Sequence, residues 1–512
     1  MSRYLQLFFL GLVLLLCACA QVGTLTGGSK DEFAPAPKKI SPPSKTTQFS
    51  GNSIQFEFDE YIKLENPQQN VYFIPGDVKP TVELYKKTVT VSWNESLQPN
   101  TTYTLYMNGA VKDTHEGNDS LMTYVFSTGE IIDSISYSVT TADAWSGKPL
   151  SKILVALYED SISTKAKYFA QTDFSGRTTI QNMKPGTYFL RAFADLDKNL
   201  AISENEIRGF NAEKIDLYDS AVDSFPVRMF KPQNQKISTF KLQAPGMISI
   251  AKIGLSDVQL SMGNKVLEDE QIYRLNEDSV LLFLPSDSIS LLEVVASKDD
   301  RSDTLRMTVS KRDHQTKLNL KPTIKRAIRP SEKIEFEVND RILSLNIAKI
   351  VVVDANTKDT LEVKEASFFA NRIVLELDRK SHSKIDVIFQ DGAFSSTHVK
   401  SSMASTLSID LKSDRDLGSI KVNTWESNEP LLLFVYQQGT LDRVVTIPEE
   451  HTIIIPELEP GNYTFKVVED VNRNGKWDVG DDAHFVQPEI IHEFVGPTVR
   501  ANWETEIQLS ID

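Results

Sequence analysis

Short runs in which apolar and polar residues alternate recur along most of the chain, and they predict β-strands. Residues 53–58 (Ser-Ile-Gln-Phe-Glu-Phe) and 88–93 (Thr-Val-Thr-Val-Ser-Trp) place every second side chain on one face, and residues 333–338 repeat the pattern. Segments with the helical period are nearly absent. We therefore predict an all-β protein of tandem sandwiches, in which each sheet buries one face against another sheet.

One supersecondary pattern occurs twice in the chain. A Pro-Gly turn opens a strand, and the strand ends in a loop rich in acidic and amide side chains. The two copies, residues 185–206 and 460–481, align without a gap. The repetition of a whole strand and loop indicates two copies of one domain.

The chain has 512 residues, more than a single hydrophobic core supports. Residues 20–45 include several prolines and are typical of an extended spacer. From the strand pattern and the turns we predict a signal peptide at 1–18, a tether at 19–45, a sandwich at 46–129, a sandwich with an acidic loop at 130–232, two sandwiches with weaker signatures at 235–320 and 321–412, and a second sandwich with an acidic loop at 413–512.

The first residues have the features of an export signal. Arg3 supplies a positive charge, and residues 5–16 form an apolar run that is short for a membrane span. The run leads into Leu-Cys-Ala-Cys (16–19), which resembles the bacterial lipobox of leucine, any residue, a small residue and the lipidated cysteine. This resemblance implies that Cys19 is acylated at the mature N-terminus and holds the protein to a membrane. An ordinary secretory signal with incidental cysteines is the alternative.

Two further observations concern the location of the protein. Alanine follows Cys19, and in the Gram-negative sorting pattern this favours the outer membrane. Cys17 and Cys19 are the only cysteines, so the mature body has no disulfide. We predict an outer-membrane lipoprotein that is either periplasmic or exposed at the cell surface.

The overall charge argues against a nucleic-acid partner. The chain carries 70 acidic and 55 basic residues, a formal net charge of −15, and no stretch rich in Lys or Arg offsets it. An acidic surface is also typical of a soluble protein outside the cytoplasm. The partners that we expect are the membrane, through the lipid, and an envelope or surface protein or a glycan.

Four short motifs in residues 46–129 carry a family resemblance: 56–61 (Phe-Glu-Phe-Asp-Glu-Tyr), 97–103 (Leu-Gln-Pro-Asn-Thr-Thr-Tyr), 115–118 (His-Glu-Gly-Asn) and 126–129 (Phe-Ser-Thr-Gly). The segment resembles the bacterial Ig-like domain of the S-layer (SbsA-like) type. His115 and Glu116 are interpreted as part of a polar loop between strands. The strand at 333–338 echoes the one at 53–58, so 321–412 is expected to be a further Ig-like sandwich.

The segments that contain the acidic loops resemble another group of modules. Their strand order is similar to that of the prealbumin-like sandwiches found in collagen-adhesin B repeats and carboxypeptidase regulatory domains, which support other domains and are not enzymes. Together with the lipobox, the chain resembles an Ig-like lipoprotein of Bacteroidetes. This resemblance implies a scaffolding, presenting or adhesive role without naming a ligand.

The later acidic loop has the spacing of a calcium-binding loop. Calcium takes six to eight oxygen ligands, and alternate residues of a short loop can supply them. Gly475 stands at the sixth position, where such a loop bends. The ligands expected at positions 1, 3, 5, 7, 9 and 12 are Asp470, Asn472, Asn474, Lys476 through its carbonyl, Asp478 and Asp481.

The earlier loop offers a weaker version of the same set. Leu200 replaces the bend glycine and must therefore adopt a strained backbone conformation. For both loops the alternative is a hairpin tip held by its own hydrogen bonds between side chains and backbone. The expected ligands here are Asp195, Asp197, Asn199, Ala201 through its carbonyl, Ser203 and Glu206.

Four motifs of known enzyme classes are absent from the sequence: the Gly-x-Ser-x-Gly elbow, the His-Glu-x-x-His helix, the P-loop and the dinucleotide-binding glycine pattern. We therefore predict a non-enzymatic surface protein, possessing structural calcium. The alternative is a surface glycan-binding lipoprotein of a polysaccharide-uptake system, with Trp477 as an exposed stacking surface. A pair of carboxylates distant in the sequence, as in glycoside hydrolases, is a further alternative.

Asp-Ser/Thr-apolar triplets recur along the chain. They resemble the O-glycosylation acceptors of Bacteroidetes, and ordinary turn chemistry before a strand explains them equally well. The triplets begin at Asp119, Asp133, Asp160, Asp219, Asp278, Asp287, Asp303 and Asp359.

The lipid anchor gives a direct prediction. Mass spectrometry of the native protein is expected to find an acylated Cys19 as the first residue. Cys19→Ser is expected to abolish acylation, whereas Cys17→Ser, the matched control, is expected to keep it. An intact leader, or an unmodified first residue after cleavage, would contradict the prediction.

Overall fold

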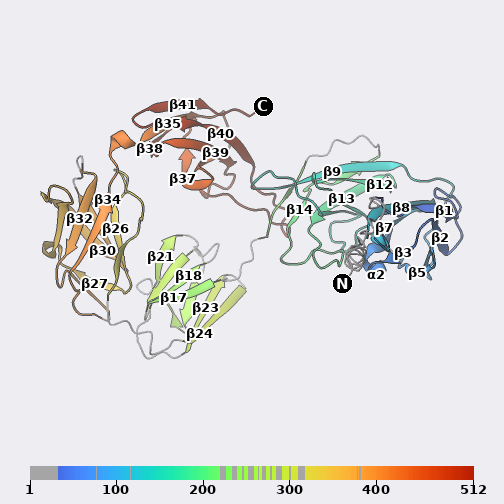
Figure 1. Cartoon of the computed structure of the whole chain (residues 1–512), viewed down its shortest axis with the longest axis horizontal. Coiled ribbons are helices and arrows are strands. Elements are labelled where there is room, and N and C mark those ends of the chain that lie inside the picture. Colours follow the sequence, from blue (N-terminus) through green and yellow to red (C-terminus); the bar gives the residue numbers. More distant parts are fainter. Residues whose placement is uncertain are drawn as a thin grey trace, which may run out of the picture. The chain divides into compact units, whose positions relative to one another are not determined.

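The computed structural model describes residues 33–511 apart from 77, 116, 219–225, 233–238, 245–246, 252–258, 263–264, 268–271, 277–278, 284–290, 299–300, 309–317, 378, 380–381 and 398. The predicted signal peptide and Cys19 lie outside these residues. Within them, no helix has the length and apolar character that crossing a bilayer requires. They are almost entirely strands and loops, which confirms the predicted all-β class (Figure 1).

The first sandwich buries one face of each of its sheets, as the alternating sequence pattern requires. Ile54, Phe56 and Phe58 of β2 are buried, and the polar residues between them are exposed. One sheet has the order β1-β2-β6-β5, and in the other β7 pairs with β3, β4 and β8. The elements are β1 (Pro37–Ser41), β2 (Ser53–Phe58), β3 (Ile62–Leu64), α2 (Pro67–Asn70), β4 (Val71–Ile74), β5 (Thr81–Tyr85), β6 (Thr88–Ser92), β7 (Thr102–Asp113) and β8 (Asp119–Ser127).

The strand order of the first sandwich recurs twice. The sheets β17-β18-β22-β21 and β25-β26-β31-β30 repeat the order β1-β2-β6-β5. In the facing sheets, β23 lies between β19 and β24, and β32 lies between β28 and β34, as β7 lies between β4 and β8. The echo between residues 333–338 and 53–58 therefore corresponds to equivalent strands, β26 and β2.

The bounds of these two sandwiches are as follows. The earlier one contains β17 (Thr239–Ala244), β18 (Met247–Ala251), β19 (Gln259–Met262), β20 (Lys265–Val266), β21 (Ile272–Asn276), β22 (Ser279–Phe283), β23 (Leu291–Lys298) and β24 (Arg301–Thr308). The later one contains β25 (Leu320–Pro322), β26 (Ile334–Val338), β27 (Ile342–Leu345), η4 (Ile347–Lys349), β28 (Ile350–Asp354), β29 (Thr360–Leu361), β30 (Val363–Phe369), β31 (Arg372–Leu377), β32 (Lys384–Phe389), β33 (Phe394–Ser396) and β34 (Ser405–Asp410).

The segments with the acidic loops share a second strand order. In one, β10 lies between β11 and β13, and β9 pairs with β12. In the other, β36 lies between β37 and β39, and β35 pairs with β38. The strands are β9 (Ile135–Asp143), β10 (Leu154–Tyr158), β11 (Tyr168–Gln171), β12 (Arg177–Met183), β13 (Gly186–Phe193), β14 (Arg208–Phe210), β15 (Ile215–Leu217), β16 (Val227–Met229), β35 (Gly418–Asn423), β36 (Leu431–Gln437), β37 (Thr440–Ile447), β38 (Thr452–Leu458), β39 (Gly461–Glu469), β40 (Ile491–Val499) and β41 (Glu504–Gln508).

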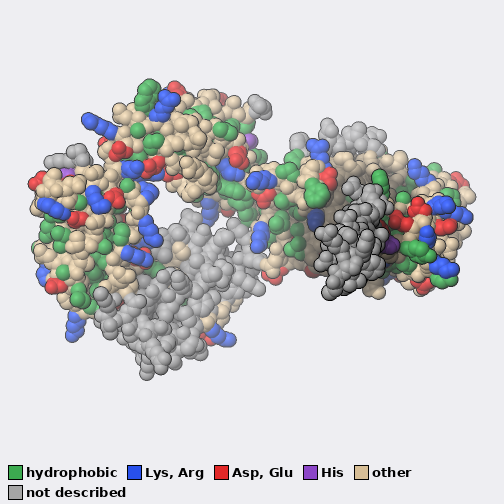
Figure 2. Space-filling model, in the orientation of Figure 1, with side chains coloured by type: hydrophobic (Ala, Val, Ile, Leu, Met, Phe, Trp, Pro, Cys, Tyr) green, Lys and Arg blue, Asp and Glu red, His purple; other side chains and the backbone are tan. Residues whose placement is uncertain are grey.

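The chain forms two compact units. The first comprises the residues up to 141 with 149–202 and 213–227, and the second comprises 142–148, 203–212 and 228–512. On the face drawn in Figure 2, acidic and basic side chains are interspersed over the described residues. This mixture is typical of a surface in contact with water.

A buried ion pair holds the last sandwich to the segment before β26. Both terminal nitrogens of the Arg329 guanidinium donate to the Asp442 carboxylate, Nη1 at 3.2 Å. The side chain of Arg329 is 6% exposed and that of Asp442 is 9% exposed. Arg443 donates a further hydrogen bond to Asp442 at 2.7 Å. Burial raises the pKa of Asp442, but the bonds from Arg329 and Arg443 outweigh it and hold this pKa below its usual value.

We expect Arg329→Met to destabilise the second unit by about 3 kcal/mol, because it leaves a buried carboxylate with one cation instead of two. The folded-state pKa of Asp442 is depressed, so its contribution is present above the unfolded pKa and is lost as the pH falls through the folded value. The difference between variant and wild type should therefore shrink in acid. Urea unfolding of the full chain at several pH values measures it.

Arg306→Met is the matched control, because the pair between Arg306 and Glu293 is 69% and 41% exposed. An exposed pair of this kind contributes at most about 1 kcal/mol. Equal losses for the two variants would contradict a special role for Arg329.

Candidate functional site

The two acidic loops follow equivalent strands of equivalent sheets. Strand β13 ends shortly before Asp195, and β39 ends directly before Asp470. Strand β13 pairs with the buried strand β10, and β39 pairs with the buried strand β36. These pairings fix the position at which β13 and β39 end. The sequence therefore positions both loops at the same place in the fold.

The first carboxylate organises each loop. Asp470 is 2% exposed, and its two oxygens accept the N–H groups of Asn474 at 3.0 Å and Gly475 at 2.9 Å. Asp195 accepts the N–H of Asn199 at 2.9 Å and that of Leu200 at 3.3 Å. In both loops the first side chain thus binds the backbone of the fifth and sixth residues.

The next side chains continue the same frame. The oxygen of the third residue accepts the N–H of the fifth at 3.1 Å in the later loop and at 3.2 Å in the earlier one. The amide oxygen of the fifth residue accepts the N–H of the seventh at 3.0 and 2.6 Å. The two loops therefore share one hydrogen-bonding pattern, of the kind expected for a self-supporting hairpin tip.

The backbone conformations also agree. The fourth and sixth residues are left-handed in both loops, with φ of 57° and 58° for Lys198 and Leu200 and 61° and 77° for Arg473 and Gly475. Leu200 therefore occupies the strained conformation that the sequence predicted. Gly475 takes it without strain, because glycine has no Cβ.

A buried glutamate closes the earlier loop. Glu206 is 3% exposed, its N–H donates to the carbonyl of Ser203 at 3.2 Å, and its carboxylate accepts the N–H of Ser203 at 2.9 Å. Oxygens of Asp195, Asp197 and Glu206 lie within 4.8 Å of one another. The structure thus brings these three predicted carboxylates together, and the side-chain amide of Asn199 donates to the Asp197 carboxylate at 2.9 Å. Ala201 is half-buried.

The Asp481 carboxylate forms its hydrogen bonds with residues that follow it and are not in the predicted ligand set. Asp481 forms an antiparallel bridge with Val486, and its carboxylate lies 2.7 Å from Nδ1 of His484. Burial raises the pKa of Asp481, but the hydrogen bonds from His484 and Ala483 outweigh it and lower this pKa. Asp481 thus belongs to a hairpin over residues 479–488 that the earlier loop lacks.

Glu489 occupies the place that Glu206 has in the earlier loop. The N–H of Glu489 donates to the carbonyl of Asp478 at 3.1 Å, and its carboxylate accepts the N–H of Asp478 at 2.9 Å. These are the two bonds between Glu206 and Ser203. Glu489 is 8% exposed and also accepts the N–H of Val471 at 2.9 Å.

Glu489 was not predicted from the sequence, because it lies many more residues beyond the ninth loop position than Glu206 does in the earlier loop. One signal in the sequence was available: both glutamates precede an isoleucine, Ile207 or Ile490, just before the next strand. The dipeptide is too short to identify a ligand by itself.

The later loop concentrates negative charge around Glu489. Burial raises the pKa of Glu489, and the charges of Asp478 and Asp470 raise it further, while the N–H groups of Asp478 and Val471 lower it. The Asp478 carboxylate also accepts the side-chain amides of Asn472 and Asn474. Carboxylate and amide groups therefore surround Glu489, but among the described residues it is the carboxylates of the earlier loop, Asp195, Asp197 and Glu206, that lie within 4.8 Å of one another.

Trp477 differs from the predicted exposed stacking surface. It is half-buried, its indole N–H donates to the carbonyl of Glu489 at 3.2 Å, and its ring centre lies 4.9 Å from that of Trp145. Lys466 donates to the carbonyl of Trp145 at 2.6 Å. Trp477 therefore packs the loop against residues 142–148.

The inserted hairpin contacts residues 203–212 within the second unit. Asp482 pairs with Arg208 at 3.0 Å, and the side-chain amide of Gln487 donates to the carbonyl of Phe210 at 2.7 Å. The Phe210 and Phe485 rings meet edge to face at 5.8 Å. The insertion thus adds a packed contact and is not a loose loop.

Other predicted features are dispersed. His115 lies in a polar turn with its side chain 83% exposed, and Glu116 is outside the described residues. Among the triplet hydroxyls, Ser134, Thr304 and Thr360 are exposed and Ser161 is half-buried. Ser220 and Ser288 lie outside the described residues.

Two family models match parts of the chain. Residues 31–128 match the model described as a bacterial Ig-like domain, and residues 137–196 match the one described as polysaccharide lyase family 4, domain II. The first match confirms the resemblance to bacterial Ig-like domains. No curated protein matches the chain.

Solved structures of surface proteins show a distant likeness. The N-terminal part of the bacterial S-layer protein SbsC is 13% identical over 31% of this chain and 40% of its own length, with a TM-score of 0.15. Domains 1–6 of SbsC are 11% identical over 92% of this chain and 68% of that chain, at a TM-score of 0.16. SGBP-B of the Bacteroides ovatus mixed-linkage glucan utilization locus, in complex with a heptasaccharide, is 9% identical over 74% and 92%, at 0.19.

The chain spans 40% of the first of these structures.

The two bend residues provide a matched pair of substitutions. Leu200→Gly is expected to stabilise the first unit by up to about 1 kcal/mol, because it removes a left-handed strain. Gly475→Ala is expected to cost about 1 kcal/mol through φ alone, since no atom lies within 4 Å of the added Cβ. Thermal unfolding of the full chain in a chelator measures both without metal.

Leu200→Ala separates the backbone from the side chain, because it shortens the side chain and keeps the strain. If Leu200→Ala stabilises the unit as much as Leu200→Gly does, the left-handed strain is not the cause.

Proposed function

We propose that this protein is a non-enzymatic, lipid-anchored protein of the cell envelope, whose sandwiches form a stiff scaffold or presenting arm at the outer membrane. Acylated Cys19 would hold it to the membrane, and the proline-rich tether would space the sandwiches from the lipid. The match of residues 31–128 to a bacterial Ig-like domain favours a structural role for this protein.

The observation that carries this proposal is the repetition of two self-contained strand orders. One occurs in three sandwiches and the other in two, and extensive buried cores lie inside individual sandwiches. A unit with its own core can fold by itself, so several such units can be joined in series. The Arg329–Asp442 pair then restrains one junction, as a stiff arm requires.

We further propose that calcium stiffens the two acidic loops. In the later loop the residues that would hold it are Asp470, Asn472, Asn474, Asp478 and Glu489, with Glu489 in place of Asp481. In the earlier loop they are Asp195, Asp197, Asn199 and Glu206. The fit is supported by the chemistry of the donors, since a cation would relieve the repulsion that raises the pKa of Glu489.

When bound, calcium would supply positive charge to the converging carboxylates. The protein's own hydrogen bonds hold Asp470 and Glu489 in place beforehand, so little ordering would be needed on binding. The role of the ion is therefore stiffening and not catalysis.

Calcium at millimolar concentration is expected to raise the melting temperature of the full chain relative to chelator. Extracellular calcium modules bind with dissociation constants of roughly 0.1–1 mM, so about 10 mM calcium should add about 1–3 kcal/mol at each loop. Calorimetry of the full chain measures the shift. Glu489→Gln should remove the contribution of the later loop, because it removes a carboxylate facing Asp470 and Asp478.

Asp481→Asn is the matched control, because this carboxylate bonds His484 outside the set. It should leave the calcium shift intact. Equal melting temperatures in calcium and chelator would end the proposal for both loops. A shift that is lost in Asp481→Asn but kept in Glu489→Gln would restore the ligand set expected from spacing.

A further inference from the structure

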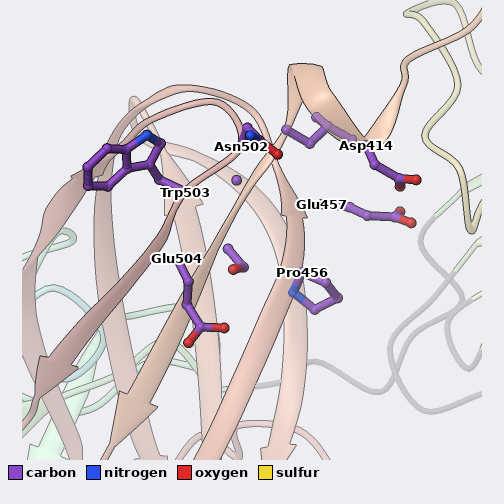
Figure 3. A pocket seen from close by; sticks show the side chains of 9 residues that line it. Asp414, Pro456, Glu457, Asn502, Trp503 and Glu504 are labelled. Carbon is purple, nitrogen blue, oxygen red and sulfur yellow. The ribbon is translucent and has the colours of Figure 1, made fainter.

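A hollow of about 350 Å³ opens in the last sandwich, away from the acidic loop (Figure 3). Its walls come from η5 (Asp414–Asp416) and the start of β35, from the end of β38, and from the turn between β40 and β41. The polar and aromatic side chains that line it are Asp414, Ser419, Glu457, Asn502, Trp503 and Glu504.

The floor of this hollow is rigid. A Cβ on Gly418 would lie 2.4 Å from the carbonyl oxygen of Arg500, so the two backbones approach as closely as glycine permits. The N–H of Asn502 donates to the carbonyl of Leu417 at 2.8 Å, and that of Ser419 donates to the carbonyl of Trp503 at 3.0 Å. The turn that carries Asn502 and Trp503 is thereby fixed, and the hollow is preformed as binding sites usually are.

Glu457 is held in a defined orientation at one end. Its carboxylate oxygens accept the N–H of Ser331 at 2.9 Å and the hydroxyl of Ser331 at 2.5 Å. In Figure 3 Asp414 and Glu457 are seen on one side of the hollow and Glu504 on the other. No Lys or Arg lines the hollow in the part of the chain that the structure describes. Three of its lining side chains are carboxylates, and Arg443 lies next to the hollow, donating to the carbonyl of Glu457 at 3.4 Å.

Trp503 forms the other end. Trp503 is 64% exposed, and in Figure 3 its indole points away from Asp414 and Glu457. The exposed indole offers a flat apolar face and one N–H donor beside polar groups. This differs from Trp477, which is packed and bonded inside its own loop.

We propose that this hollow binds a carbohydrate whose sugar units are neutral or carry an amino group. An oligosaccharide presents an apolar C–H face on one pyranose unit, which fits the indole of Trp503, and hydroxyls on its other units, which fit the carboxylates and the Asn502 amide. Carboxylates accept hydroxyl or ammonium donors strongly, and they repel an anionic sugar. The negative lining therefore selects against uronic acids.

The inference goes beyond the scaffold role, because it adds a ligand class and a place for it. Calcium stiffening and lipid anchoring can fail without affecting it. The lining carboxylates and the indole of Trp503 come from different strands and turns. This arrangement fits an extended ligand better than a single small ion.

Calorimetric titration of the full chain with three hexasaccharides tests the proposal: one of β-1,4-linked glucose, one of β-1,4-linked glucosamine and one of galacturonic acid. Binding is expected for the glucose or the glucosamine hexamer and not for the galacturonic acid hexamer. Trp503→Ala is expected to weaken the binding at least about tenfold, in line with the loss of an aromatic anchor. Glucosamine binding should also weaken in high salt.

Phe174→Ala is the matched control, because Phe174 is an exposed aromatic side chain in a turn of another sandwich, 92% exposed. It should bind as the wild type does. Glu504→Gln is a second variant, expected to reduce glucosamine binding more than glucose binding. The proposal is overturned if neither the glucose nor the glucosamine hexamer binds at millimolar concentration, if galacturonic acid binds as well, or if Trp503→Ala binds unchanged with a wild-type melting curve.

Discussion

In the sandwiches whose cores the structure describes, the apolar faces of the sheets are buried against one another, and the rest of the structure depends on that constraint. The side chains of β2 alternate between a core of Ile54, Phe56 and Phe58 and a polar outer face. A slip of one residue would exchange the two faces, so the register of each strand is set by its own sequence. The only cysteines lie at positions 17 and 19, which leaves packing to hold the sandwiches together. Once the registers are set, the ends of the strands are set as well.

The acidic loops show how such fixed ends are used. Because β13 and β39 end at equivalent places, the first carboxylate after each strand can bind the backbone of its own loop in the same way. The loop then needs only one distant group to close it. Glu206 and Glu489 supply that group. Glu206 lies close in the sequence to its partner Ser203, whereas the inserted hairpin separates Glu489 from its partner Asp478. The strands of the sheet therefore determine, together with the loops, where these carboxylates lie.

Local chemistry was predictable from the sequence, and chemistry that depends on distant contacts was not. The alternation of residues predicted the strands, and the Asp-x-Asn-x-Asn spacing predicted the frame of the later loop, because both depend on neighbours a few residues apart. The strain at Leu200 was predictable for the same reason. The role of Glu489 depends on an inserted hairpin, and the burial of Trp477 depends on Trp145 from far earlier in the chain. The hollow beside Trp503 requires three separated segments, so no single motif could announce it.

The reciprocal pair of bonds between the ninth loop residue and its glutamate has a consequence for evolution. Both bonds depend on where the two residues lie in space and not on how many residues separate them. The chain between them can therefore lengthen without opening the loop, and the hairpin at 479–488 is one such extension. A duplicated module can therefore acquire new surface at this point at little cost to its fold. Searches for related modules that demand a fixed number of residues would discard these diverged copies, whereas searches that pair the loop with a glutamate-isoleucine at the head of the following strand would retain them.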